Sequence, residues 1–359
     1  MKRTLLVCLS LLMIVGLLAG CGSEVNNEET NRTVVDMQGK TVNLPNTIDS
    51  YCVLYSSAVP MCAMLDKNLE NMVMYPVSSY FEYWYSEMFE GINDHAVQVD
   101  KKTVTAEQIL ESGAQVVFWN RASHEELVAS LEAAGVACVN VQVNNSDDLI
   151  HAIHVIADTF GTDYSQTQAS KYESKTAEWL QTVDEHASKI PESEKKTVLV
   201  LGDVYSPNVG ATDNYQGYWT SRAGLLNVSP VKPGEPDATL TMEEIYDLDP
   251  DIIIVQNPLN RKELNNDAQW KEVRALKDGM LYSNPSVLDE WGMPTNESPL
   301  QFLWVLTEFY PQYSSDINAE EELISFFKEF YDYDMTAENA QAIMSGHHFF
   351  LNEALKDYE

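Results

Sequence analysis

Positive charge is scarce in this sequence. Its 359 residues include 22 lysines and arginines against 55 aspartates and glutamates, which gives a formal net charge of -33 at pH 7. A nucleic-acid-binding surface must supply lysine and arginine to displace counterions from phosphates, so the composition argues against nucleic acid as a partner. A cationic ligand is compatible with this charge, but a soluble, self-repelling surface is the plainer explanation.

Several motifs of catalysis and cofactor binding are also missing. The sequence has no G-x-S-x-G, no H-E-x-x-H and no G-x-G-x-x-G after a strand. His124-Glu125 lacks the second histidine of a zinc protease, and the helical pair His151 and His154 falls on a presumed connecting helix. We therefore expect no enzyme, no catalytic residue, no metal held by protein side chains alone and no resident cofactor.

The first 21 residues have the pattern of an export signal. Lys2 and Arg3 precede an apolar run over residues 5–19, which is too short to span a bilayer comfortably. The run ends in Leu-Ala-Gly-Cys at 18–21, which resembles a bacterial lipobox and makes Cys21 the expected lipidation site. The alternative is an ordinary signal peptide with an incidental cysteine.

Cysteine is used sparingly. Of five cysteines, Cys8 lies in the signal and Cys21 at its end, which leaves Cys52, Cys62 and Cys138. An odd number excludes a fully paired framework. Either Cys52 pairs with Cys62 or all three are buried thiols, and the lack of C-x-x-C argues against a zinc or redox site of that type.

Short apolar strands alternate with helices in two series, which implies parallel sheets with βαβ crossovers. A hairpin is expected over 34–44, and residues 147–190 keep an unbroken helical period. The sequence thus predicts an α/β protein of two βαβ, Rossmann-like lobes bridged by a single long α-helix. The expected segments are a signal peptide (1–20), a tether (21–33), an N-terminal lobe (34–146), a connecting helix (147–190) and a C-terminal lobe (191–359).

A short internal repeat links the two lobes. VTAEQIL at 104–110 precedes AQVVFW at 114–119, and LTMEEIY at 240–246 precedes PDIIIV at 250–255. Each copy predicts a helix with a capping box, followed by a buried strand: Thr105 with Gln108, and Thr241 with Glu244. Glu107 and Glu243 then occupy matching positions in the first helical turn, where the helix dipole favours a carboxylate.

From about residue 34 to 346 the chain resembles substrate-binding proteins of bacterial importers for iron complexes, haem and cobalamin. The resemblance rests on TVVDMQGKTVNLP (33–45), the T-x-E-x-I helix before a strand in each lobe, WKEVRALKDGMLYSNPSVLDEW (270–291), and SPLQFLWVLTEFYP (298–311) before an FFKEFY helix. It implies two lobes bridged by one rigid helix, a ligand in the cleft between them and only modest closure. It further implies that Glu107 and Glu243 dock into arginine pockets on the two halves of a permease.

Ligands of βαβ lobes lie at the carboxyl ends of the strands. Arg121 directly follows an expected strand and suits a carboxylate or phenolate oxygen, unless it only pairs with Glu125. If residues 79–89 are helical, we expect Tyr80, Tyr83 and Trp84 to lie outside the apolar side that faces the core. There they can stack on a flat ligand or, for tyrosine, bind ferric iron. Alternatively they only cover the surface. The remaining candidates are Trp119, Tyr205, Tyr218, Trp219 and, by the resemblance, Trp291.

The expected function is that of a lipid-anchored extracytoplasmic protein of an ABC importer that captures a ferric-siderophore-type metal chelate. Cobalamin, another corrinoid, or haem in the same role is the alternative ligand. Two other classes are a surface metal-dependent enzyme and a sensor ectodomain, the latter disfavoured because no membrane span precedes Glu359. The expected partners are a permease dimer with its ATPase, the chelate, and the membrane through the anchor, with the protein itself a monomer.

Overall fold

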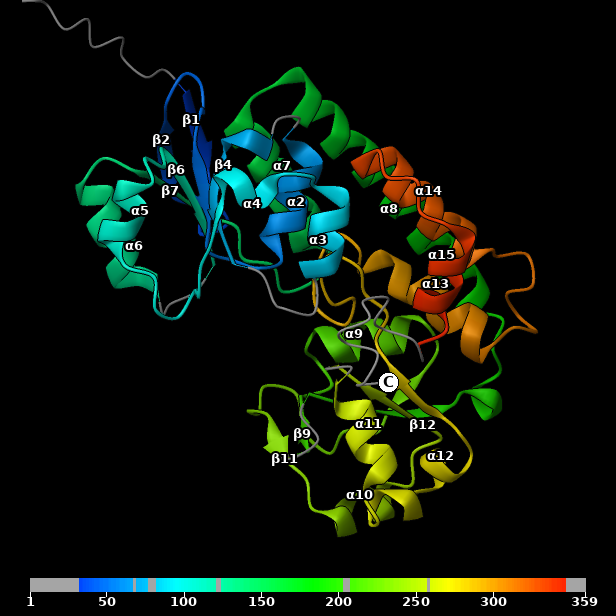
Figure 1. Ribbon diagram of the computed structural model, residues 1–359. Helices are drawn as coiled ribbons and strands as arrows, with labels where there is room; N and C mark the ends of the chain where they lie inside the picture. Colours follow the sequence, from blue (N-terminus) through cyan, green and yellow to red (C-terminus); the bar gives the residue numbers. More distant parts are fainter. Residues whose placement is uncertain are drawn as a thin grey trace, which may run out of the picture.

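The computed structural model describes residues 32–66, 69–76, 82–120, 124–202, 207–256 and 259–346. They form two lobes, each built on a parallel sheet, with helices running along one side of both (Figure 1). None of the helices in these ranges is both long and apolar enough to cross a membrane.

The N-terminal lobe contains a five-stranded parallel sheet in the order β5-β4-β3-β6-β7. Alternate side chains of its central strands enter two separate apolar clusters, one on each face. Helices α5 and α6 lie on one face and α2 on the other (Figure 1). The bounds are β1 (Arg32–Val35), β2 (Thr41–Leu44), β3 (Tyr51–Val53), α2 (Ala58–Leu65), η2 (Leu69–Asn71), β4 (Met72–Tyr75), α3 (Glu82–Met88), α4 (Ile92–His95), β5 (Val97–Gln98), α5 (Ala106–Glu111), β6 (Val116–Trp119), α6 (Glu125–Ala133) and β7 (Ala137–Asn140).

The C-terminal lobe contains a four-stranded parallel sheet in the order β10-β8-β12-β13. Its strands β8 and β12 are buried almost throughout, as expected for a sheet covered on both faces. The bounds are η4 (Glu192–Glu194), β8 (Thr197–Leu201), β9 (Asn208–Val209), α9 (Tyr215–Arg222), β10 (Leu226–Asn227), β11 (Ala238–Thr239), α10 (Met242–Leu248), β12 (Ile252–Val255), α11 (Leu259–Asn266), η5 (Trp270–Glu272), α12 (Arg274–Lys277) and β13 (Leu281–Ser283).

The connection between the lobes consists of two helices, α7 (Ser146–Phe160) and α8 (Asp163–Ala187), so the expected single helix over 147–190 is wrong. Gly161 ends α7 with a φ of 66°, and Thr162 begins α8 with a capping box to Ser165. The apolar period continues across this corner because both helices pack on the same core. The periodicity of apolar residues alone therefore does not predict the break at Gly161.

Two C-terminal helices pack against α8, namely α13 (Pro299–Phe309) and α14 (Ala319–Tyr331), and α15 (Ala337–Met344) packs on α14 (Figure 1). One apolar cluster includes these helices, α8, and one face of each sheet. The two lobes are therefore joined by a continuous core as well as by the connecting helices, which opposes large relative motion.

Cys52, Cys62 and Cys138 are free, buried thiols, which decides against a disulfide between Cys52 and Cys62. Cys52 points into the core beneath α5 and α6, and Cys62 into the core on the opposite face of the sheet. Burial raises the pKa of both thiols, because the thiolate would lose its hydration. These cysteines are therefore unreactive packing residues.

Candidate functional site

Segments that follow strands of both sheets meet at the junction between the lobes. Ser57 follows β3 and Lys101 follows β5 in the N-terminal lobe, whereas Asp289 follows β13 in the C-terminal lobe. Burial opposes ionisation of the Asp289 carboxyl group, whereas a hydrogen bond from Ser57 and the positive charge of Lys101 favour its ionised form. The carboxyl ends of the strands thus converge on one place, as ligand sites of parallel sheets require.

The N-terminal side of this junction is polar and carries a positive charge. Lys101 is half-buried, and its Nζ donates a hydrogen bond to Ser56 Oγ at 3.0 Å. The backbone carbonyl of Lys101 lies 2.9 Å from Nε2 of the buried His124. This contact orients the segment that presents the lysine, so its ammonium group is held beside Ser56, one residue before the N-cap of α2.

The C-terminal side is formed by residues 284–298, which we call the junction loop. Fully buried Glu297 holds it together, because its two carboxyl oxygens accept from Leu288 N at 2.8 Å, Val287 N at 3.1 Å and Trp291 Nε1 at 2.7 Å. Asn284 is held separately by Gln301, whose Nε2 donates to Asn284 Oδ1 at 2.8 Å.

The junction loop also contacts the N-terminal lobe directly. Asn296 Nδ2 donates to Tyr331 OH at 2.6 Å and lies 3.7 Å from the sulfur of Met64 on α2. Tyr331 OH in turn donates to the carbonyl of Pro60, also on α2, and Tyr172 OH of α8 donates to the carbonyl of Asn296. The loop is therefore seated between α2, α8 and α14.

Three carboxyl groups of this loop are difficult to ionise. Burial raises the pKa of Asp289 above its ordinary value, and raises the pKa of Glu290 and Glu297 to about 8. For Glu297 the three donors act in the opposite direction, and for Glu290 the single donor is Asn284 Nδ2 at 3.3 Å. No group of acidic, cysteine or histidine side chains suited to a metal ion occurs within the described ranges.

Four predicted site residues, Cys21, Tyr80, Arg121 and Tyr205, lie outside the described residues. Of the others, Tyr83 and Tyr218 are half-buried, and Trp119 is 5% exposed. The indole Nε1 of Trp119, at the carboxyl end of β6, has no hydrogen-bond partner among the residues placed by the structure. It is a donor that a ligand or a neighbouring segment can use.

The remaining tryptophans are packed inside. Trp84 is 3% exposed, so its expected position off the core stripe is wrong; its ring meets Tyr83 and Tyr333 edge-on. Trp219 and Trp291 are fully buried, and neither presents a face for stacking in this conformation. Trp291 is held in place by its bond to Glu297.

Some residues at the junction were not identified from the sequence. Lys101 was missed because the two-residue strand β5 before it has no clear pattern, and Asp289 because acidic residues are so common in this chain. Gln256 and Met293 also meet on the C-terminal side, where Gln256 Nε2 lies 3.7 Å from the sulfur of Met293. Met293 is 40% exposed and offers an apolar surface there.

The predicted pair Glu107 and Glu243 lies away from this junction, in the first turns of α5 and α10. Both side chains are exposed, and both helices have complete capping boxes, from Thr105 with Gln108 and from Thr241 with Glu244. Neither glutamate is thus needed to cap its helix. Hydrogen bonds from the first-turn backbone and Thr105 lower the pKa of Glu107 and keep it ionised.

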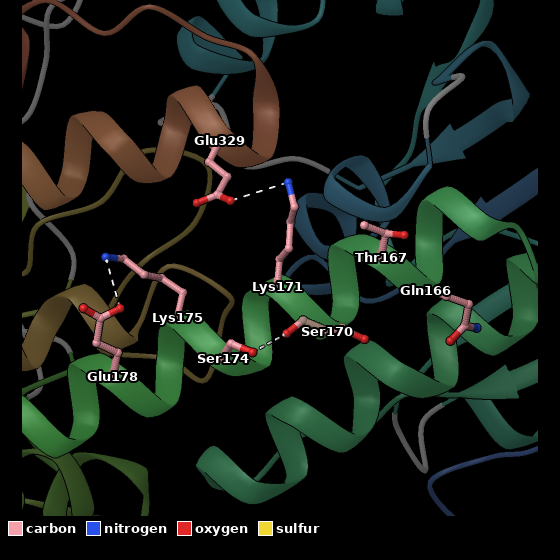
Figure 2. A pocket seen from close by; sticks show the side chains of 8 residues that line it. All are labelled: Gln166, Thr167, Ser170, Lys171, Ser174, Lys175, Glu178 and Glu329. Carbon is pink, nitrogen blue, oxygen red and sulfur yellow. Dashed lines mark hydrogen bonds and ion pairs between the residues drawn. The ribbon is translucent and has the colours of Figure 1, made fainter.

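Two surface hollows lie along α8, apart from the junction. The larger, of about 670 Å³, is lined by eight polar residues of α8 and α14 (Figure 2). Lys171 pairs with Glu329 at 3.6 Å, and Lys175 with Glu322 at 2.7 Å. Their charges are already matched, so this hollow is a solvated surface rather than a converging site.

The sequence and the fold have clear relatives. A profile of the protein family described as periplasmic binding protein matches residues 92–288. The chain is 20% identical over 334 residues to the molybdate-binding protein MolA of Haemophilus influenzae, covering 86% of this chain and 93% of MolA. It is 23% identical over 302 residues to the uncharacterized ABC transporter substrate-binding lipoprotein YvrC of Bacillus subtilis, covering 79% and 90%.

Solved structures share the fold over most of the chain. The structure of Haemophilus influenzae MolA bound to molybdate has a TM-score of 0.75 at 18% identity and covers 85% of this chain and 99% of MolA. The triscatecholate siderophore-binding protein FeuA of Bacillus subtilis, complexed with ferri-bacillibactin, has a TM-score of 0.60 at 21% identity and covers 79% and 99%. At these identities the likeness establishes the two-lobed fold.

Proposed function

Because this chain belongs to the periplasmic binding protein family, we propose that it is the substrate-binding protein of an ABC importer. The observation that carries the proposal is the convergence of post-strand segments from two parallel-sheet lobes on one junction. That arrangement suits a solute bound between two surfaces. Binding and delivery of a solute are the functions we propose for it.

The proposed ligand is a ferric-siderophore-type metal chelate, with cobalamin, another corrinoid or haem as the alternative. The proposed aromatic ligand-binding residues are Tyr83 on α3, Trp119 at the end of β6 and Tyr218 on α9, and Tyr80, Arg121 and Tyr205 complete the proposed set. FeuA, one of the structural neighbours, is described as a siderophore-binding protein. Trp84, Trp219 and Trp291 join this set only if the junction opens and uncovers them.

Molybdate is a second candidate, favoured by one specific observation. The relative MolA is described as molybdate-binding and matches in both sequence and fold. The junction of this chain offers the hydroxyl groups of Ser56 and Ser57 beside the ammonium group of Lys101, which suit the oxygens of an oxyanion.

The proposed location is the outer face of the cell membrane, with a lipid on Cys21 and the tether connecting it to the lobes. YvrC is described as a lipoprotein, which supports the same arrangement here. Replacing Cys21 by Ala is expected to yield an unlipidated protein that is released or retains its signal. If the Cys21→Ala protein still fractionates with membranes in processed form, the anchor proposal fails.

The proposed partner is a permease dimer with its ATPase, which a monomer of this protein contacts through Glu107 and Glu243. Matching exposed glutamates on two lobes suit a two-fold-symmetric partner. Their contribution would be to registry and association rate rather than to the stability of the fold.

Native mass spectrometry of the mature protein tests the ligand. The panel contains ferric siderophores, haem, cobalamin, free iron and nickel, and molybdate. We expect one ferric chelate to be retained at one copy per chain. Retention of molybdate alone would make the protein an oxyanion carrier, and chemical conversion of a bound chelate would support the enzyme alternative instead.

A further inference from the structure

Two exposed apolar side chains occupy the same position of the internal repeat. Within the described ranges, six large hydrophobic side chains are exposed, and two of them are Leu110 on α5, at 42%, and Tyr246 on α10, at 39%. Each is the seventh residue of its copy of the repeat, and the two helices belong to different lobes (Figure 1). Single exposed apolar residues are common on protein surfaces, but exposure at matching positions of two lobes indicates a shared role. We call Leu110 and Tyr246 the apolar pair.

The packing of the two helices does not depend on the apolar pair. The residue before each member, Ile109 or Ile245, is fully buried and supplies the contact with the core. Among the residues that the structure places, the apolar clusters beneath α5 and α10 contain neither Leu110 nor Tyr246. The other exposed residues of both helices carry carboxylates or an amide. A polar side chain would therefore serve the fold equally well at either position.

Each member of the apolar pair lies one turn after a glutamate. Leu110 follows Glu107 by three residues on α5, and Tyr246 follows Glu243 by three residues on α10. Residues three apart share a helix face, with Cβ atoms about 5–6 Å apart. Each lobe thus presents a carboxylate and an apolar side chain together, on the surface proposed above to meet the permease.

Tyr246 is held in position before any partner binds. Its OH donates to the carbonyl of Gln269 at 2.7 Å, which fixes the ring on the surface. The end of α10 is fixed as well, because the guanidinium group of Arg274 donates to the side chain and the carbonyl of Asp249 at the C-cap. A side chain that is already ordered loses less conformational freedom on contact.

We propose that Leu110 and Tyr246 pack against the permease, each beside a positively charged side chain that the neighbouring glutamate binds. The inference rests on the proposed importer function and adds what each permease subunit offers, namely an apolar depression next to a positive charge. Charged groups at an interface mainly set the association rate, whereas buried apolar contacts mainly slow dissociation. The glutamates and the apolar pair therefore have separable kinetic effects.

Two other occupants suit this surface less well. In a two-fold contact between copies of this chain, each glutamate would lie near its own equivalent, and like charges repel. A bilayer of anionic lipids repels a chain with a formal net charge of -33. A permease dimer with basic side chains matches both the carboxylates and their presence on two lobes.

Binding kinetics on the permease–ATPase complex in nanodiscs test the apolar pair. Leu110→Gln with Tyr246→Gln should raise the dissociation rate constant about tenfold and change the association rate constant less than about twofold. Glu107→Gln with Glu243→Gln should instead lower the association rate constant about tenfold at low salt. The glutamate effect should shrink at ~0.5 M NaCl, where charges are screened, whereas the effect of the apolar pair should persist.

The matched control is Val35→Gln with Leu226→Gln, which removes one exposed apolar side chain from each lobe, on β1 and β10. Its dissociation rate constant should equal that of wild type, and circular dichroism checks the folding of every variant. Tyr246→Phe keeps the ring and should dissociate more slowly than Tyr246→Gln. If the apolar pair variant dissociates no faster than the control, or Tyr246→Phe as fast as Tyr246→Gln, the assignment is wrong.

Photocrosslinking in intact cells identifies what covers the apolar pair. With p-benzoylphenylalanine in place of Leu110 or Tyr246, the expected product joins this protein to a permease subunit, identified by mass spectrometry. A product with a second copy of this chain, or with lipid alone, would overturn the inference. If wild type binds no permease, the proposed importer function fails and the inference fails with it. If wild type binds and only the glutamate variant is impaired, the proposed function stands and this inference alone fails.

Discussion

At the scale of single residues, Glu297 determines the shape of the junction loop. Its two oxygens accept three N–H groups, from Val287, Leu288 and Trp291. A glutamine in its place has one acceptor oxygen and turns an amide donor toward these donors, so at least one buried N–H loses its partner. We expect Glu297→Gln to lower the free energy of unfolding by about 1–3 kcal/mol.

Urea unfolding at pH 6, below the raised pKa, measures this effect without the desolvation cost of the ionised side chain. Glu111→Gln, an exposed change at the end of α5, is the matched control and should alter stability by less than about 0.5 kcal/mol. Equal stability of the two variants would show that Glu297 is not the residue that holds the loop.

Glu290 leads to a prediction about pH. Desolvation of its carboxyl group raises its pKa to about 8, whereas an unfolded glutamate titrates near 4.5. Between these values the folded protein binds more protons than the unfolded chain, so this group makes stability fall as pH rises, by about 1.4 kcal/mol per pH unit. Below the unfolded pKa the carboxyl group is neutral in both states, so the stability that it costs at higher pH is fully regained.

Glu290→Gln removes that group, so its stability should decline less between pH 5 and pH 8 than that of wild type. Urea unfolding at several pH values in this window provides the comparison, with Glu111→Gln again as the control. Identical pH slopes for Glu290→Gln and wild type would contradict a raised pKa at this position.

At the scale of elements, the corner between α7 and α8 depends on one glycine. Gly161 has a φ of 66°, and a Cβ there would meet the guanidinium group of Arg32. That guanidinium donates to the carbonyls of Asp158 and Thr159 at the end of α7 and to those of Pro45 and Asn46. Arg32 thus ties the beginning of the first hairpin to the corner.

Gly161→Ala should lower stability by more than the roughly 1–2 kcal/mol of a left-handed residue, because it also displaces Arg32. Gly113→Ala is the matched control, since Gly113 has a φ of 75° and open space around its Cβ position. Thermal unfolding of both variants measures the difference. A smaller effect at Gly161 than at Gly113 would refute the role of Arg32.

The elements show why some predictions succeeded and others did not. The two capping boxes and the strands after them follow from local rules, and the structure confirms them at Thr105 and Thr241. The break at Gly161-Thr162 also has a local signal, but the apolar period continued through it and outweighed it. The junction loop could not be predicted, because the burial of Glu297 and Trp291 depends on partners brought together only by folding.

At the scale of the whole molecule, the continuous core sets the spacing of the two lobes. One apolar cluster contains strand residues of both sheets together with α8 and α13. Separating the lobes would expose this surface to water, which is unfavourable in proportion to its area. Glu107 and Glu243, which are exposed on α5 and α10, are therefore held at a nearly constant separation.

A constant separation is what a rigid, two-fold-symmetric partner needs, and this leads to the last prediction. Replacing Glu107 and Glu243 together by Ala should reduce transporter ATPase stimulation and ligand uptake by about tenfold or more, because two charge-assisted contacts are lost. Ligand affinity and melting temperature should hardly change, since Thr105 with Gln108 and Thr241 with Glu244 still cap the helices. The control is Glu111→Ala with Asp247→Ala, which removes two exposed carboxylates from the same helices. If both double variants support uptake equally, Glu107 and Glu243 do not dock to the permease. The matching helices then reflect only that both lobes fold in the same way.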